Sequence, residues 1–293
     1  MNDILVLTKR NIKIYLRDKA AVFFSFLSII ILLALYFLFL KNAYITDELA
    51  DLLAKNEIEF ITNSLMISGV LVINTLTLSL GNLGNIINDF SRRKLDGFLI
   101  APIKRYKIIV SYYLSSLFIT ATLTLFMWFL SAILIGIQTS IWYSFNQVMM
   151  VSLYVILFTF ISTAFMIFLT TFINSVNTFG AITGVFGTII GFISGIYMPI
   201  YVLPKFIQNI TSLVPFTHMT IVLRRQLLDP KLASLETTLP QELIAIYKEI
   251  FGIQPMKIFN LNLHFWWILL ITSVIAVLLL IWATFRLAVK IKK

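Results

Sequence analysis

The sequence predicts an all-α membrane protein with six transmembrane helices, and three observations lead to that fold class. The first is composition, because 59% of the 293 residues are hydrophobic and only 12% are charged. Soluble domains carry roughly 45–50% apolar and about 25% charged residues, so the apolar excess has to face lipid. The second observation is the length of the apolar runs, and the third is the position of the basic residues at their ends.

Six apolar runs are long enough to cross a bilayer, because a hydrocarbon core of about 30 Å requires about 20 helical residues. They occupy residues 20–40, 60–87, 108–135, 148–173, 179–198 and 265–285. Each run is expected to be a helix, because an open strand would leave backbone groups without hydrogen-bond partners in lipid. No small-residue cleavage site follows the first run, so it is not a signal peptide.

Basic residues are concentrated in three segments: before the first run, between the second and third, and after the sixth. Cytoplasmic loops are enriched in Lys and Arg, and these three segments alternate correctly with six spans. Both termini are therefore expected in the cytoplasm, in a multi-pass protein of the cell membrane. The net charge of +10 is assigned to orientation in the lipid bilayer, so no nucleic-acid partner is expected.

Residues 1–19 precede the first run and show a helical pattern. Leu5, Thr8, Ile12 and Leu16 recur at helical spacing, while basic residues lie elsewhere around the axis. This pattern predicts an amphipathic helix on the inner membrane surface. A short charged tail is the alternative.

Residues 88–107 form the largest predicted cytoplasmic loop, which mixes a basic cluster with five large apolar side chains. A loop that only orients the protein requires the charges but not the apolar residues. A short helix that docks on a soluble partner requires both, and Pro102 would then end or turn it. Both alternatives stay open on composition alone.

Residues 199–263 are too polar and too interrupted by proline to span the membrane. Three amphipathic pieces, at residues 204–213, 217–228 and 240–251, predict an extracytoplasmic cap of interfacial or re-entrant helices. The whole chain, residues 1–293, is thus expected to be one transmembrane domain. No function is assigned to residues 229–262.

Two runs carry stripes of polar or small residues, each within an arc of about 80° at 100° per residue. The polar stripe of the second run either lines a substrate path or forms hydrogen bonds between helices. The glycine stripe of the fifth run allows close helix approach, within the chain, at a pore or at a dimer seam. The stripes consist of Asn74, Thr77, Gly81, Asn85 and Asn88, and of Gly180, Gly184, Gly187, Gly191 and Gly195.

The chain lacks the residues that most transport or enzyme chemistry needs. No charged residue lies centrally in any of the six runs, which argues against an ion-coupled carrier. No catalytic Ser/His/Asp set, metal-ligand cluster or cysteine appears, and no glycine is followed by lysine as a Walker A motif requires. We therefore expect no enzyme activity, and no cofactor or metal bound by this chain.

Two stretches, set among six spans, carry a resemblance that covers essentially the whole chain. Residues 89–109 read DFSRRKLDGFLIAPIKRYKII, an acidic and then basic segment that ends in a small-residue–Pro turn. Residues 194–224 contain a Ser-Gly…Pro, Leu-Pro and Pro-Phe-Thr series that runs to an arginine. With the amphipathic N-terminus and the predicted cap, they resemble the permease subunit of ABC type-2 transporters.

The resemblance implies a coupling helix that contacts a separate ABC ATPase and a route lined by the second and fifth spans. The ATPase, present in two copies, would hold ATP and Mg²⁺, and two permeases would form a homodimer or a heterodimer. Asp89 stands where the family has a glutamate. The implied coupling residues are Asp89, Phe90, Arg92, Arg93, Leu95, Phe98 and Pro102, and the implied cap motif is Pro199, Pro204, Pro215 and Arg224.

The function expected from this resemblance is ATP-driven export of an amphipathic substrate, such as a drug, a peptide toxin or a lipid-like molecule. Two alternatives from other classes remain. One is a secondary carrier that works without an ATPase. The other is a membrane-bound immunity or binding protein that transports nothing.

Overall fold

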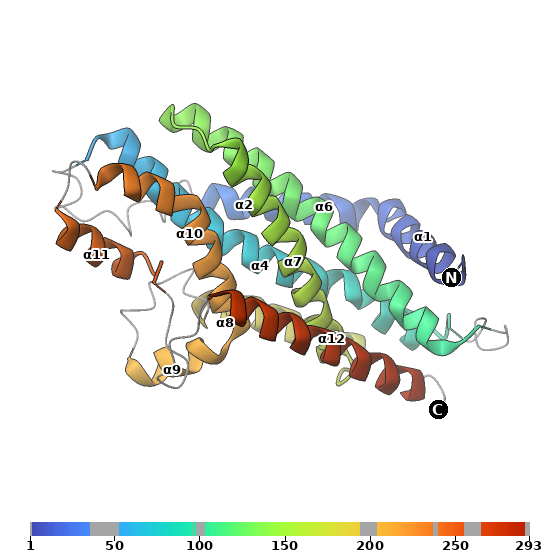
Figure 1. Cartoon of the computed structure of the whole chain (residues 1–293). Helices are drawn as coiled ribbons and strands as arrows, with labels where there is room; N and C mark the ends of the chain where they lie inside the picture. The colour runs from blue at the N-terminus through green and yellow to red at the C-terminus, as the bar shows by residue number, and fades with distance from the viewer. Residues whose placement is uncertain are drawn as a thin grey trace.

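The computed structural model describes residues 2–35, 53–95, 97, 103–193, 204–236, 240–254 and 265–290. All regular secondary structure in these ranges is helical, so the predicted all-α class is confirmed (Figure 1). The helices are α1 (Asn2–Arg17), α2 (Lys19–Leu35), α4 (Lys55–Ser91), α6 (Arg105–Thr139), α7 (Phe145–Thr170), α8 (Val176–Ile193), α9 (Lys205–Leu213), α10 (Pro215–Leu235), α11 (Gln241–Ile250) and α12 (Phe265–Lys290).

Four helices of the described residues are apolar and long enough to cross a membrane, namely α4, α6, α7 and α12. The pair α9 and α10, bent by 88° at their junction, gives a fifth candidate. The predicted first and fifth runs, residues 20–40 and 179–198, extend past the described parts of α2 and α8. The count of six spans therefore stays a prediction.

The central helix of the bundle is α4, which packs against α6, α7, α8 and α10. Most of its residues are buried, and Leu71, Leu83 and Ile86 are fully enclosed. Its 37 residues correspond to a length of about 55 Å, well beyond the hydrocarbon core of a bilayer. Because α4 is so long, it connects the two ends of the bundle mechanically.

The chain termini lie at one end of the bundle. In Figure 1 the N-terminus, the C-terminal end of α12 and the junction between α4 and α6 lie at the same side, which we call the terminal end. At the opposite end, which we call the far end, the side-chain amide of Asn56 donates to the carbonyl oxygen of Thr139 at 3.5 Å. This arrangement agrees with the prediction that the three basic segments lie on the same side of the membrane. Which side of the membrane that is stays a prediction.

The described part of the predicted cap is helical, but its longest helix packs along the bundle. Phe216, near the start of α10, meets Phe165 of α7 with ring centroids 5.3 Å apart. Near the start of α7, the side-chain amide of Gln147 donates to the carbonyl oxygen of Leu227 at 3.2 Å. Thus α10 is antiparallel to α7 and begins deep in the bundle, as a re-entrant helix does. The side of the membrane on which this segment lies stays a prediction.

The amphipathic helix expected at residues 1–19 is present as α1, but its apolar stripe faces the protein only in its middle, where Ile12 packs against the core. Leu5 and Leu16 are 60% and 61% exposed, whereas Leu7, Asn11 and Tyr15 are buried against the bundle. Helical spacing predicts that an apolar face exists, but not whether that face meets lipid or protein. The stripe at Leu5 and Leu16 is therefore available for the membrane surface.

Candidate functional site

The junction between α4 and α6 is where the coupling segment was predicted, and the structure shows how α4 ends there. The backbone N–H of Lys94 donates to the carbonyl oxygen of Asp89 at 3.0 Å, and that of Arg93 to Phe90 at 3.1 Å. These two bonds form a Schellman motif, in which the residue after the helix C-cap takes a left-handed backbone conformation. Arg93 occupies that position with φ 53°. Residues Asp89 and Phe90 therefore belong to the last turn of α4, not to a separate coupling helix.

The remaining coupling residues divide into exposed, buried and undescribed ones. Arg92 and Arg93 are exposed at the tip of α4, and Leu95 is buried at 2% exposure. Phe98 and Pro102 lie outside the described residues. The end of α4 thus presents Arg92, Arg93 and Lys94 to solvent and packs Leu95 inward.

Asp89 is a buried carboxylate at the centre of this junction. The hydroxyl of Tyr112 donates to its Oδ2 at 2.5 Å, and a guanidinium nitrogen of Arg10 donates to the same oxygen at 3.2 Å. The ammonium of Lys94 lies 3.9 Å from Oδ1. Asp89 of α4 therefore binds α1 and α6 through one carboxylate oxygen, Oδ2, while its other oxygen faces Lys94.

Two further polar contacts fix α1 on the first turns of α6. Lys107 forms an ion pair with Asp3 at 2.6 Å, and the side-chain amide of Asn11 donates to Ser111 at 3.3 Å. The hydrogen bond and charge of Lys107 lower the pKa of Asp3. Burial disfavours the charged form of Arg10, but Tyr112 and Asp89 more than offset it and raise its pKa. All these contacts favour α1 and α6 moving together.

Along the bundle, one face of α4 is fastened to its neighbours by hydroxyl and amide groups. The hydroxyls of Thr75 and Ser162 are 2.9 Å apart, and those of Ser79 and Thr163 are 2.7 Å apart. The amide of Asn74 donates to Thr124 of α6 at 3.3 Å. Asn74, predicted as part of a path or a seam, thus forms a hydrogen bond between helices.

The other polar residues of the same stripe line a cavity of about 330 Å³. α4 contributes Thr77, Gly81 and Asn85, together with two neighbours, Leu78 and Asn82. The opposite wall is formed by Tyr15 at the end of α1 and by Ala21, Phe24 and Ser25 at the start of α2. The structure thus brings three of the five residues of this stripe together, while Asn74 and Asn88 do not line the cavity.

Close packing between helices was one expected role of the α8 glycines, and the structure shows what surrounds two of them. A Cβ added at Gly180 or Gly184 would have no heavy atom within 4 Å. Gly191 is buried, Gly187 lies within α8, and Gly195 is outside the described residues. Among the described residues, the space into which a Cβ at Gly180 or Gly184 would point is therefore open.

The close contact of α8 occurs instead at Gly84 of α4. A Cβ at Gly84 would lie 2.7 Å from the ring of Phe179. Sequence analysis missed this residue, although Gly81 and Gly84 stand three positions apart in the second run. Two small residues at that spacing were the available signal, because they place small side chains on adjoining faces of one helix.

At the far end, the side chain of Arg224 is a buried anchor. Its guanidinium donates to the carbonyl oxygen of Phe251 at 3.0 Å and lies against Gly252, whose φ is +61°. A Cβ at Gly252 would approach this guanidinium to 2.8 Å, so glycine is required by contact and by backbone conformation. Arg224 thus fastens the loop after α11 to α10.

The predicted cap prolines occupy helix starts. Pro204 is the N-cap residue of α9, and Pro215 is the first residue of α10, where its missing N–H costs nothing. Pro199 lies outside the described residues. Pro215 therefore stands at the 88° bend between α9 and α10, and Pro204 at the opposite end of α9.

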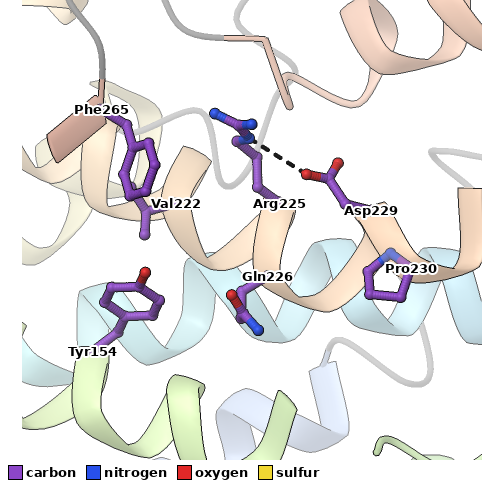
Figure 2. Close-up of a pocket in the computed structure, with 7 residues that line it drawn as sticks. All are labelled: Tyr154, Val222, Arg225, Gln226, Asp229, Pro230 and Phe265. Atoms are coloured by element: carbon purple, nitrogen blue, oxygen red, sulfur yellow. Dashed lines mark hydrogen bonds and ion pairs between the residues drawn. The ribbon is translucent and has the colours of Figure 1, made fainter. Parts of the chain in front are cut away.

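A second cavity, of about 170 Å³, lies between α7, α10 and the start of α12 (Figure 2). Arg225 forms an ion pair with Asp229 at 3.4 Å, and its guanidinium lies 5.5 Å from the ring centroid of Phe265. Tyr154 and Gln226 add polar groups, as Figure 2 shows. Sequence analysis did not predict this cavity. Its two charges face one another, which leaves little net charge for a ligand.

The fold and these contacts can be compared with known proteins. A family model described as ABC-2 type transporter matches residues 2–228. The match runs from α1 to α10 and includes the Asp89 junction, the cavity beside α4 and Arg224. A search of curated proteins found no match.

Proposed function

Because this chain belongs to the ABC-2 type transporter family, we propose that it is the permease subunit of an ATP-driven exporter in the cytoplasmic membrane. Two permeases, alike or different, and two copies of a separate ATPase would form the complex. The cargo is an amphipathic molecule such as a drug, a peptide toxin or a lipid-like compound.

The energy source is assigned to another chain because this one has no sequence for holding nucleotide. None of its 11 glycines is followed by lysine, so the phosphate-binding loop of an ATPase is absent from the sequence. ATP and Mg²⁺ would bind to the partner, whose hydrolysis of ATP would supply the work. This chain would receive that work as a displacement at the junction between α4 and α6.

The Asp89 junction carries the proposal. A force applied at Arg92 and Arg93 acts directly on the end of α4, and Asp89 links that end to Arg10 and Tyr112. Packed side chains and charge-assisted hydrogen bonds transmit displacement because they resist separation. The three helices would move as one unit, and α4 would carry the movement across the bundle.

The proposed orientation places the terminal end in the cytoplasm. Both chain ends and the basic junction lie at that end in Figure 1, which is the side where Lys and Arg are enriched in membrane proteins. A soluble ATPase could reach Arg92 and Arg93 only from this side.

The proposal is tested by charge reversal at the junction. Arg93→Glu should lower co-purification of the partner ATPase by about tenfold, because it places an anion where a cation is expected to make contact. The matched control is Lys205→Glu, the same reversal at the exposed first residue of α9. The control should retain wild-type binding and ATP-dependent transport in proteoliposomes.

Two outcomes would contradict the proposal and favour its rivals. Transport by the purified chain alone under an ion gradient would indicate a secondary carrier. Resistance to an antimicrobial that persists in cells without any ATPase partner would indicate a binding or immunity protein.

A further inference from the structure

The cavity beside α4 lies near one end of the bundle. Asn85, its lining residue nearest that end, is six residues before the last residue of α4, which places it about 9 Å from the helix end. Its other wall consists of the end of α1 and the first two turns of α2. In the orientation proposed above, this depth corresponds to the inner boundary between head groups and hydrocarbon.

The lining mixes apolar side chains with hydroxyl and amide groups and carries no charge. No Lys, Arg, Asp or Glu is among the residues that line the cavity, while Arg17, Asp18 and Lys19 are exposed at the nearby turn between α1 and α2. A charged ligand group inside would lose its hydration without gaining an opposite charge. The cavity therefore suits a polar group that carries no charge.

One lining group is a buried tyrosine hydroxyl. Tyr15 is 6% exposed, and no hydrogen bond of standard geometry to its hydroxyl is found within the described part of the chain. Burial raises the pKa of Tyr15 and a side-chain contact with Ser25 lowers it, so the Ser25 hydroxyl, which donates to the carbonyl oxygen of Ala21 at 2.8 Å, lies close to that of Tyr15. A group entering this cavity would therefore meet two neighbouring hydroxyls with capacity for further hydrogen bonds.

The polar groups of α4 provide a second contact point. Thr77 donates to its own helix, at the carbonyl oxygen of Ile73, and Asn82 donates to Thr120 of α6. Asn85 lies partly buried at the wall and is not held in such a bond within the described residues. An amide both donates and accepts, so Asn85 and Tyr15 together match a ligand rich in hydroxyl or carbonyl groups.

The mouth of the cavity is apolar. Phe24, which lines it, is 62% exposed, and its neighbour Phe23 is 60% exposed on the same helix. α2 falls in the first predicted span, so in the proposed orientation this exposed aromatic pair would face lipid, and a molecule in the bilayer could reach the cavity beside α2. Its apolar part would remain in contact with Phe24 and Leu78.

We propose that this cavity binds an amphipathic molecule with an uncharged, hydrogen-bonding head group and receives it from the lipid beside α2. The part of this inference that concerns loading of a cargo for transport rests on the proposed exporter function. The same chemistry is found in a neutral glycolipid of the bilayer and in a neutral cargo, and the experiment separates these two sources.

The binding test uses the full chain in nanodiscs and a dodecyl glucoside that carries a photoactivatable diazirine in its alkyl chain. Probes with the same chain and a trimethylammonium or phosphate head serve for comparison. The glucoside should label peptides of α1, α2 and α4 about tenfold more than either charged probe. Equal labelling by all three probes, or labelling spread over α12 and other exposed helices, would overturn the proposal.

Two variants assign the labelling to the cavity. Gly81→Leu should reduce it about tenfold, because a Cβ there meets no atom within 4 Å and the side chain fills empty space. The control, Thr122→Leu, introduces the same side chain at an exposed position of α6 away from the cavity and should label as wild type. Tyr15→Phe should weaken labelling by the glucoside but not by a probe without a head group. Unchanged labelling in Gly81→Leu would overturn the proposal.

A transport test with the ATPase complex separates the two claims. A cargo site predicts that ATP moves the glucoside probe outward in wild type and not in Gly81→Leu. Continued movement in a Gly81→Leu variant that has lost labelling would overturn the loading role. Cavity-specific labelling, together with a complex that transports nothing on ATP addition, would support the site as a lipid site and contradict the proposed exporter.

Discussion

On one face of α4, hydroxyl groups meet hydroxyl groups of α6 and α7, while on another face similar groups line a cavity. Thr75 belongs to the first face, where its hydroxyl lies 2.9 Å from that of Ser162. Thr77 belongs to the second, where its hydroxyl donates to the carbonyl oxygen of Ile73 in its own helix and to no other described residue. Two threonines separated by one residue therefore have different roles, because 200° of rotation brings them to different neighbours.

This difference shows that polarity in a membrane helix has two distinct uses. A polar pair between helices satisfies groups that lipid cannot satisfy and so fixes the helices together. A polar wall beside empty space keeps hydrogen-bonding capacity for a ligand. The two uses can be separated by identical substitutions on the two faces.

The largest effect on stability is expected at Asp89, in the last turn of α4, where this helix is bound to α1 and α6. Asp89→Ala should lower the free energy of unfolding by about 2–3 kcal/mol, because Arg10 and Tyr112 lose a buried charged acceptor. The same change at Asp229, whose ion pair with Arg225 is 42% exposed at the carboxylate, should cost less than about 0.5 kcal/mol. Thermal unfolding in detergent, followed by size-exclusion fluorescence, measures both. Equal losses would show that the junction is no stronger than an exposed pair.

A pair of glycines on α4 gives the next largest difference. Gly84→Leu should destabilise the protein by about 1–3 kcal/mol, because the ring of Phe179 must move away from the new side chain. Gly81→Leu should leave the unfolding midpoint near that of wild type, because its Cβ has open space around it. If the second variant unfolds as readily as the first, the two faces do not differ in the way described.

Two threonines allow a smaller and chemically identical comparison. Thr75→Val removes a hydrogen bond to Ser162 and should cost about 0.6 kcal/mol, the average for hydrogen bonds between membrane helices. Thr77→Val removes only a bond within α4 and should change stability by a few tenths of a kcal/mol at most, roughly the effect of an exposed substitution. Unfolding in mixed micelles by added SDS resolves the pair. Similar costs at both sites would remove the distinction between the faces.

The smallest effect concerns α1, which supplies one wall of the cavity. Lys107 lowers the pKa of Asp3 from its ordinary value of 3.8, so this ion pair stabilises α1 above that value and is lost as pH falls through the lowered pKa. Asp3→Asn should therefore lower the unfolding midpoint slightly near neutral pH. The difference from wild type should shrink as pH falls below 3.8 and disappear once pH lies below the lowered pKa of Asp3, where Asp3 is protonated in both states. A difference that grows on acidification would contradict this assignment.

Several features were predictable because they depend on local composition. The apolar runs predicted the positions of α4, α6, α7 and α12, and helical spacing predicted α1. Other features depend on residues far apart in the chain. Asp89 binds Arg10 across 79 positions and Tyr112 across 23, and no local pattern indicates that pairing. The start of α10 beside Phe165 was likewise set by packing and not by hydropathy.

By itself, the sequence determined that the chain is an all-helical membrane protein, that its basic ends gather on one side, and that α4 carries a polar stripe. Hydropathy and helical period encode these properties residue by residue. The tertiary structure decided which part of that stripe binds α6 and which part lines the cavity. The physical reason is that a stripe fixes the direction in which side chains point, whereas their role depends on whether a neighbouring helix or an open space lies in that direction.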